Sequence, residues 1–146
     1  MLKIIAIGHK MPKWISDGFQ EYQKRLTQPW KLELIELTPE KNKVLEAKAI
    51  LSKISRQDCC VALDPKGHGI STEQLALKLT NWQVEYPHIC FLIGGADGLD
   101  QSCLDRANYI ASLSALTFPH QFVKIIMAEQ LYRAVSILNH HPYHRS

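Results

Sequence analysis

The sequence contains no long apolar run and few cysteines. None of its stretches approaches the roughly 18 apolar residues that are needed to cross a bilayer. The apolar stretch at residues 2–8 is too short for a signal peptide, and no cleavage site follows it. The 4 cysteines form no C-x-x-C pair, which disfavours a zinc site. We therefore expect a cytoplasmic protein with buried, reduced thiols, no membrane association and no metal.

Two widespread nucleotide-binding motifs are also missing. The chain has neither G-x-G-x-x-G after its first predicted strand nor the G-x-x-x-x-G-K-[ST] phosphate loop. A Rossmann-type dinucleotide site and nucleotide hydrolysis are therefore disfavoured. The net charge of +3 is mild, so it permits an anionic partner such as a nucleic acid without requiring one.

Short apolar runs alternate with helical patterns along the whole chain. The length of 146 residues, of which 46% are hydrophobic and 21% charged, fits one globular domain. The pattern predicts strands over 2–8, 32–37, 59–64, 89–93 and 109–116. It predicts helices over about 13–26, about 41–56 and 121–139, and one more that begins with a capping box at Ser71. Strands without polar alternation, separated by helices, indicate an α/β domain with a parallel sheet covered on both faces.

Three loops follow the carboxyl ends of predicted strands, at residues 64–69, 94–98 and 116–120. Ligands of such sheets bind beyond these strand ends. The loop Gly94-Gly95-Ala96-Asp97-Gly98 allows the backbone to approach a ligand closely, and Asp97 adds a carboxylate. The same residues also fit a plain strand-to-helix turn in which Asp97 or Asp100 caps the next helix.

The segment from Ser112 to Pro119 mixes small hydroxyl residues with large apolar ones. Its serines and backbone could hydrogen-bond a heterocycle. The apolar walls of such a site would be Leu113, Leu116 and Phe118. The alternative is a buried fifth strand with Pro119 in the first turn of the next helix, but it leaves the hydroxyl residues without a role.

The last predicted helix and the tail behind it form the third candidate region. The helix is apolar over more than one face, so one face would cover the sheet and another would meet a second copy of the chain. The tail reads His140-His141-Pro142-Tyr143-His144-Arg145-Ser146. Imidazoles move protons near neutral pH, and arginine binds phosphate with two parallel hydrogen bonds. These residue types suit proton transfer and phosphate or base contacts.

Five motifs, met in order along nearly the whole chain, resemble the RlmH family. They are Met11-Pro12-Lys13-Trp14, Ile93-Gly94-Gly95-Ala96-Asp97-Gly98, Leu113-Ser114-Ala115-Leu116-Thr117-Phe118-Pro119-His120, Glu129-Gln130-Leu131-Tyr132-Arg133-Ala134 and Pro142-Tyr143-His144-Arg145. Residues from about 41 to 57 carry no matching motif. Family members often have Pro-Glu where this chain has Ala96-Asp97, so its carboxylate is one methylene shorter.

The resemblance implies a SPOUT-class methyltransferase. It implies one domain over residues 1–146, whose parallel-sheet α/β fold has a C-terminal trefoil knot, assembled as a homodimer. RlmH enzymes methylate N3 of a pseudouridine in bacterial 23S ribosomal RNA, so the ribosome is the expected partner and S-adenosylmethionine the expected cofactor. The expected cofactor-binding residues are Leu63, Gly94, Gly95, Ser114, Ala115, Leu116, Thr117, Phe118 and Pro119. The expected catalytic residues are Asp97, His120, Arg133, Tyr143, His144 and Arg145.

The implied chemistry is an in-line displacement at a sulfonium methyl group, in which the enzyme aligns the acceptor nitrogen. Asp97, His120 and His144 are the candidate bases for the N3 proton. Arg133, His144 and Arg145 would contact phosphate or base, and Tyr143 would stack on a nucleobase. Two alternatives remain: a SPOUT methyltransferase that acts on another RNA such as tRNA, and a ribosome-binding module without catalysis.

Overall fold

Five strands form one parallel sheet in the computed structural model, which describes residues 1–145. The strands are β1 (Leu2–Ile7), β2 (Leu32–Leu37), β3 (Cys59–Gly69), β4 (Ile89–Ile93) and β5 (Tyr109–Ser112). Their order in the sheet is β2-β1-β4-β3-β5, and every pairing is parallel. Strands β1 and β4 and the first four residues of β3 are almost fully buried, as expected for strands covered on both faces.

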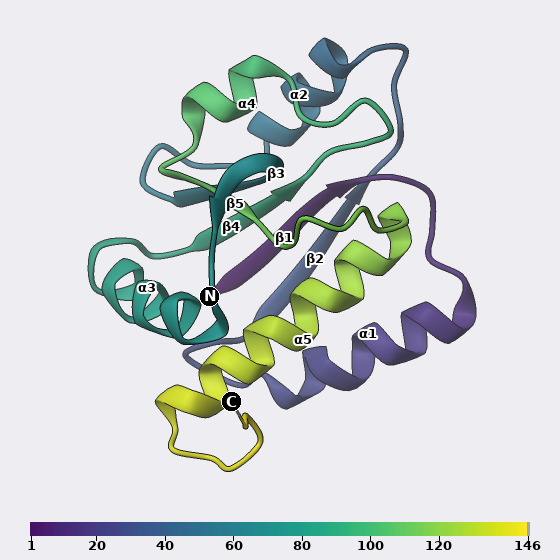
Figure 1. The fold of residues 1–146 in the computed structure, drawn as a ribbon. Helices are drawn as coiled ribbons and strands as arrows, with labels where there is room; N and C mark the ends of the chain where they lie inside the picture. The colour runs from purple at the N-terminus through teal and green to yellow at the C-terminus, as the bar shows by residue number, and fades with distance from the viewer. Residues whose placement is uncertain (146) are drawn as a thin grey trace.

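Helices cover both faces of this sheet (Figure 1). Helices α1 (Lys13–Arg25), α3 (Thr72–Glu85) and α5 (His120–Leu138) pack on one face. Helices α2 (Lys43–Leu51) and α4 (Gln101–Arg106) pack on the other. The predicted α/β class with a parallel sheet is therefore confirmed.

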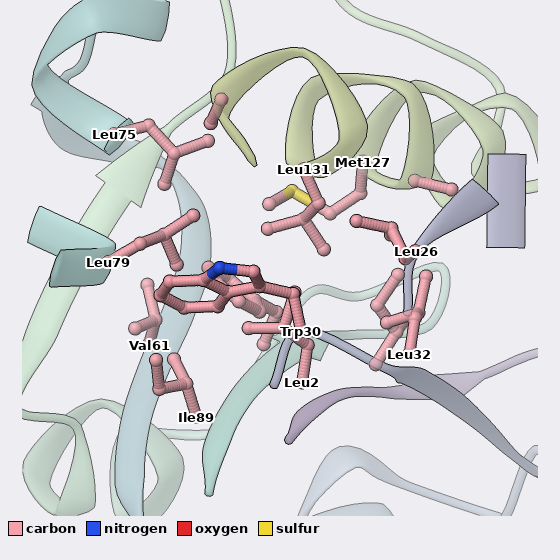
Figure 2. Packing of buried hydrophobic residues seen from close by; sticks show 14 of the residues in the cluster. Leu2, Leu26, Trp30, Leu32, Val61, Leu75, Leu79, Ile89, Met127 and Leu131 are labelled. Atoms are coloured by element: carbon pink, nitrogen blue, oxygen red, sulfur yellow. The ribbon is translucent and has the colours of Figure 1, made fainter. Parts of the chain in front are cut away.

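The larger core lies under α1, α3 and α5. Figure 2 shows Trp30, which follows α1, among strand residues such as Leu2 and Val61 and helix residues such as Leu79 and Leu131. Leu131 is completely buried, and burying a leucine stabilises a fold by about 1.5–3 kcal/mol. This core anchors the middle of α5, so the two ends of α5 are held at fixed places relative to the strand ends.

Features with a strong local sequence pattern were predicted correctly. The uniformly apolar run Ile89–Ile93 forms β4. The capping box at Ser71 is present, because the Ser71 side chain accepts from the Gln74 amide and the Gln74 side chain accepts from the Ser71 amide. The 4 cysteines are free and buried.

Other element boundaries were wrong. The helix predicted from about 41 to 56 spans only Lys43–Leu51, because Asn42 caps its start and tight turns follow Leu51. The third strand does not end at residue 64: after an irregularity between Leu63 and His68 it pairs with β5 again. Helix α4 was expected only by the plain-turn alternative, since 6 residues show less than two helical turns of pattern. Its N-cap is Asp100, as the plain-turn alternative expected.

The fifth strand was predicted too long, since it ends at Ser112 rather than at residue 116. There the Ser112 hydroxyl donates to the Ser114 carbonyl oxygen (3.2 Å) and the chain leaves the sheet. The segment 113–119, which we call the crossover, then runs from edge strand β5 back across the sheet to α5 (Figure 1). The trefoil knot stays a prediction. In the described part of the chain no helix is long and apolar enough to span a membrane.

Candidate functional site at the carboxyl ends of the strands

The ends of β4 and β5, together with residues 63–65 at the irregularity in β3, line a cavity of about 390 Å³, which we call the crossover cavity. Eight of the nine expected cofactor-binding residues line it. They are Leu63, Gly94, Gly95, Ser114, Ala115, Leu116, Thr117 and Phe118. Pro119 is the exception, because it faces a second cavity on the other side of the glycine turn.

The turn after β4 requires glycine at two positions. A Cβ at Gly94 would lie 2.5 Å from the carbonyl carbon of Gly98, so no side chain fits there. Gly98 has φ +77°, in the left-handed region that favours glycine, and its amide donates to the Gly95 carbonyl oxygen (3.0 Å). The turn is therefore tight, and it presents backbone rather than side chains to the cavity.

Serine side chains shape the opposite wall. The Ser114 hydroxyl accepts from the Leu116 amide (2.9 Å), which bends the crossover around the cavity. Leu116 lines the cavity and is itself 73% exposed.

This cavity fits a cofactor such as S-adenosylmethionine. Its volume lies within the range of small-molecule sites, about 300–1,000 Å³. It combines apolar walls for a flat ring, close backbone for polar edges, and the Asp64 side chain for hydroxyl or cationic groups.

The second cavity, of about 470 Å³, lies beside the end of β1, and we call it the β1 cavity. It shares Gly95, Ala96 and His120 with the crossover cavity, so the two adjoin through the glycine turn. Asp97 lines the β1 cavity only. The structure therefore places His120 between the two cavities and Asp97 on the side away from the expected cofactor site.

A buried lysine, which sequence reasoning missed, supports the wall of the β1 cavity. Lys124 is 1% exposed, and its Nζ lies 2.8 Å from Oε2 of Glu36. It also donates to the His9 carbonyl oxygen (3.4 Å) and to Gln121 Oε1 (3.2 Å). The signal that would have revealed it is a lysine within a helix that is apolar nearly all round, where it needs a buried partner.

The expected catalytic residues of the tail gather around Glu129. Its carboxylate accepts from Arg133 (2.8 Å) and from the Tyr143 hydroxyl (2.9 Å), and the Arg133 guanidinium lies over the Tyr143 ring. Burial raises the pKa of the Tyr143 phenol above its ordinary value, and the bond to Glu129 adds to this. His144 lies 2.8 Å from a carboxylate oxygen of Glu73, and this hydrogen bond lowers the pKa of Glu73.

Sequence reasoning did not identify the two carboxylates, Glu129 and Glu73, that hold the tail residues. Glu129 stands four positions before Arg133, the spacing of an ion pair on a helix, and could have been found from that spacing. Glu73 lies far from the tail in sequence, so nothing local reveals it. Arg145 is exposed.

Within one chain the expected catalytic residues form two separate groups. Asp97 and His120 lie beside the start of α5, whereas Tyr143 and His144 lie beyond its end. Helix α5 has 19 residues, so it is about 28 Å long. One chain therefore does not bring the tail residues to its own crossover cavity. Among the residues that the structure describes, no three metal-ligating side chains gather closely enough to hold a metal ion.

Comparisons with known proteins agree on one family. A family model described as "Predicted SPOUT methyltransferase" matches residues 1–144. The ribosomal RNA large subunit methyltransferase H of Francisella tularensis subsp. novicida is 51% identical over 153 aligned positions, covering 99% of both chains. The protein of that name from Cupriavidus taiwanensis is 45% identical over 157 aligned positions, again with 99% of both chains covered.

A solved structure has the same fold. A probable methylase family protein from Haemophilus influenzae Rd KW20 superposes with a TM-score of 0.60 at 15% identity, covering 99% of this chain and 70% of its own. At this low sequence identity, the similarity is evidence for the fold alone.

Proposed function

Because the chain belongs to the SPOUT methyltransferases, within the RlmH family, we propose that it methylates N3 of a pseudouridine in bacterial 23S ribosomal RNA with S-adenosylmethionine as methyl donor. The observation that carries the proposal is the crossover cavity, where the glycine turn and the crossover meet beside β3 and the ends of β4 and β5. The substrate is ribosomal, so we expect the enzyme to act in the cytoplasm.

The residues that would hold the cofactor are Leu63, Gly94, Gly95 and the crossover from Ser114 to Phe118. When bound, S-adenosylmethionine supplies an electrophilic methyl group on a sulfonium. The protein's own contribution is to hold the acceptor nitrogen in line with the bond that breaks, so positioning carries much of the catalysis.

The N3–H of pseudouridine must lose its proton as the new bond forms. Asp97, His120 and His144 are the candidates for accepting it. His120 is favoured within one chain because it borders both cavities, whereas Asp97 borders only the β1 cavity.

We propose a homodimer in which α5 of one chain brings its tail to the crossover cavity of the other. Trp14 is 66% exposed and makes an edge contact with Phe122 on α5 (ring centroids 5.6 Å apart). A second copy would cover this apolar surface. It would also supply Arg133, Tyr143, His144 and Arg145 to the site, which the length of α5 prevents within one chain.

The test is methyl transfer to ribosomes from a strain without this enzyme. With labelled S-adenosylmethionine we expect one new methyl group, located by mass mapping on a pseudouridine of 23S RNA. Methylation of tRNA instead would establish the first alternative. Calorimetric titration measures whether the protein binds S-adenosylmethionine. A protein that binds ribosomes but not the cofactor would establish the non-catalytic module.

A further inference from the structure

The β1 cavity adjoins the proposed cofactor site but is a separate cavity. The two cavities share Gly95, Ala96 and His120. At about 470 Å³ the β1 cavity has room for a nucleobase and its sugar. Ile7, Pro39 and Pro119 give it apolar walls among its polar groups. Any acceptor placed there lies across the glycine turn from the methyl donor.

A buried carboxylate lines this cavity. Glu46 is 8% exposed, and its Oε2 accepts from the Glu40 amide (3.2 Å). Within residues 1–145 the recorded hydrogen bond goes to Oε2, and Oε1 is not among the fully buried atoms that lack a partner, so Oε1 remains accessible. Both oxygens lie behind the glycine turn, 3.2 and 3.3 Å from the place where a Cβ on Gly95 would be. Because Glu46 lines the cavity, its accessible carboxylate oxygen offers an acceptor to a ligand N–H.

The rest of the wall is fixed, so Glu46 faces a preformed site. Lys124 uses Glu36, Gln121 and the His9 carbonyl oxygen as acceptors. The Gln121 amide nitrogen also donates to the His9 carbonyl oxygen (2.9 Å). These bonds tie α5 to the loop after β1, and a wall held on both sides orients a flat base.

Pseudouridine carries a donor that uridine lacks. Its base is attached to ribose through carbon, so N1 keeps a hydrogen, whereas N1 of uridine is bonded to the sugar. Both bases present the same N3–H and carbonyl oxygens. An enzyme that selects pseudouridine therefore needs an acceptor for N1–H, and a carboxylate is the strongest acceptor among side chains.

We propose that the β1 cavity binds the acceptor base and that Glu46 accepts the N1–H of pseudouridine, which makes it the residue that distinguishes pseudouridine from uridine. This inference rests on the proposed function. N1 and N3 flank the same ring carbon, so a base held by Glu46 through N1 has N3 beside the rim that Gly95 and His120 form between the cavities. There the methyl group leaves sulfur for N3, and the N3 proton passes to a base of the site.

The experiment compares two kinds of ribosome with the same variants. One kind comes from a strain without this enzyme and carries pseudouridine at the target. The other comes from a strain that also lacks the pseudouridine synthase for that position, and carries uridine. We expect the native protein to prefer pseudouridine. Glu46→Ala should lose about 10- to 100-fold in rate on pseudouridine, the scale of a lost hydrogen bond to a charged group, with little change on uridine.

Three controls separate this role from a structural one. Glu46→Gln keeps an oxygen for the Glu40 amide, so it should fold even if Glu46→Ala fails to. Its preference for pseudouridine over uridine should also fall. Glu33→Gln removes an exposed carboxylate on β2, outside both cavities, and should discriminate like the native protein. Calorimetric titration with S-adenosylmethionine should give the native affinity for each folded Glu46 variant.

The outcomes are distinct. Equal loss on both ribosomes, or a fall in cofactor affinity that matches the loss of rate, would assign Glu46 to support of the glycine turn and overturn the inference. A native protein that methylates both ribosomes equally would overturn it too, while leaving the proposed methyl transfer intact. No methylation of either ribosome by the native protein would instead overturn the proposed function itself.

Discussion

A methyl group added at Gly94 would lie 2.5–2.6 Å from the backbone of Gly98, so the turn after β4 would have to move. We expect Gly94→Ala to lower the affinity for S-adenosylmethionine at least about tenfold and to lower the melting temperature, since neither backbone segment has room to yield. Gly69→Ala is the matched control, because a Cβ there meets nothing within 4 Å. Calorimetry and thermal unfolding measure both effects. An unchanged affinity in Gly94→Ala would remove the glycine turn from the cofactor site.

The four buried thiols make the stability of the fold depend on pH. Burial raises the pKa of Cys59 and Cys60 to about 12 and that of Cys90 and Cys103 to about 11. In the unfolded chain a thiol ionises near its ordinary pKa, about 8.5. Between roughly pH 9 and 11 the unfolded chain therefore loses thiol protons that the folded chain keeps, so stability is full below this window and falls as pH rises through it.

Urea unfolding at pH 7, 9 and 10.5 measures this fall. Lysines and tyrosines ionise in the same range, so the comparison is with Cys60→Ala, whose stability should fall less steeply because one buried thiol is gone. Equal slopes for the two proteins would contradict the prediction.

At the scale of elements, the described part of the tail is held against α5 and α3 by hydrogen bonds. Glu129 holds Tyr143 (2.9 Å), and Glu73 on α3 holds His144 (2.8 Å). We expect deletion of residues 143–146 to abolish methyl transfer while leaving cofactor affinity within about twofold, because Tyr143, His144 and Arg145 do not line the crossover cavity. Near-normal methylation of ribosomes by the truncated protein would leave the tail without a catalytic role.

At the scale of the whole molecule, the two groups of site residues stand at opposite ends of α5. A dimer that joins them should form at micromolar concentration, measured by light scattering. Trp14→Glu should give a monomer with little activity, since it places a charge on an apolar surface that one chain leaves 66% exposed. Val84→Glu is the control, because Val84 is 83% exposed on α3. A native protein with the mass of a monomer would contradict the dimer.

Complementation tests the exchange of the tail between chains. Gly94→Ala should lack a working cofactor site, and the protein truncated after residue 142 should lack a working tail. Mixed dimers of the two would pair one intact cofactor cavity with one intact tail, so activity should reappear on mixing. Continued inactivity of the mixture, with heterodimers present, would argue that each chain completes its own site.

The sequence by itself determined the parts of this protein that depend on neighbouring residues. The apolar run Ile89–Ile93 became β4 as predicted, and Ser71 and Gln74 capped α3, because both signals act within a few residues. The glycine turn at 94–98 was also placed correctly after a strand end, since parallel strands with helical crossovers bring their carboxyl ends to one edge. The loops predicted at 64–69 and 116–120 were not, because β3 continues to Gly69 and β5 ends at Ser112.

Only the tertiary structure decided how distant residues meet. It brought Glu46 of α2 behind Gly95, paired Lys124 with Glu36 on β2, and turned Pro119 toward the β1 cavity rather than the crossover cavity. It also held the tail about 28 Å of helix away from His120. The physical reason is that these contacts join segments separated by tens of residues, and the periodicity of a local segment carries no information about which distant surface it will meet.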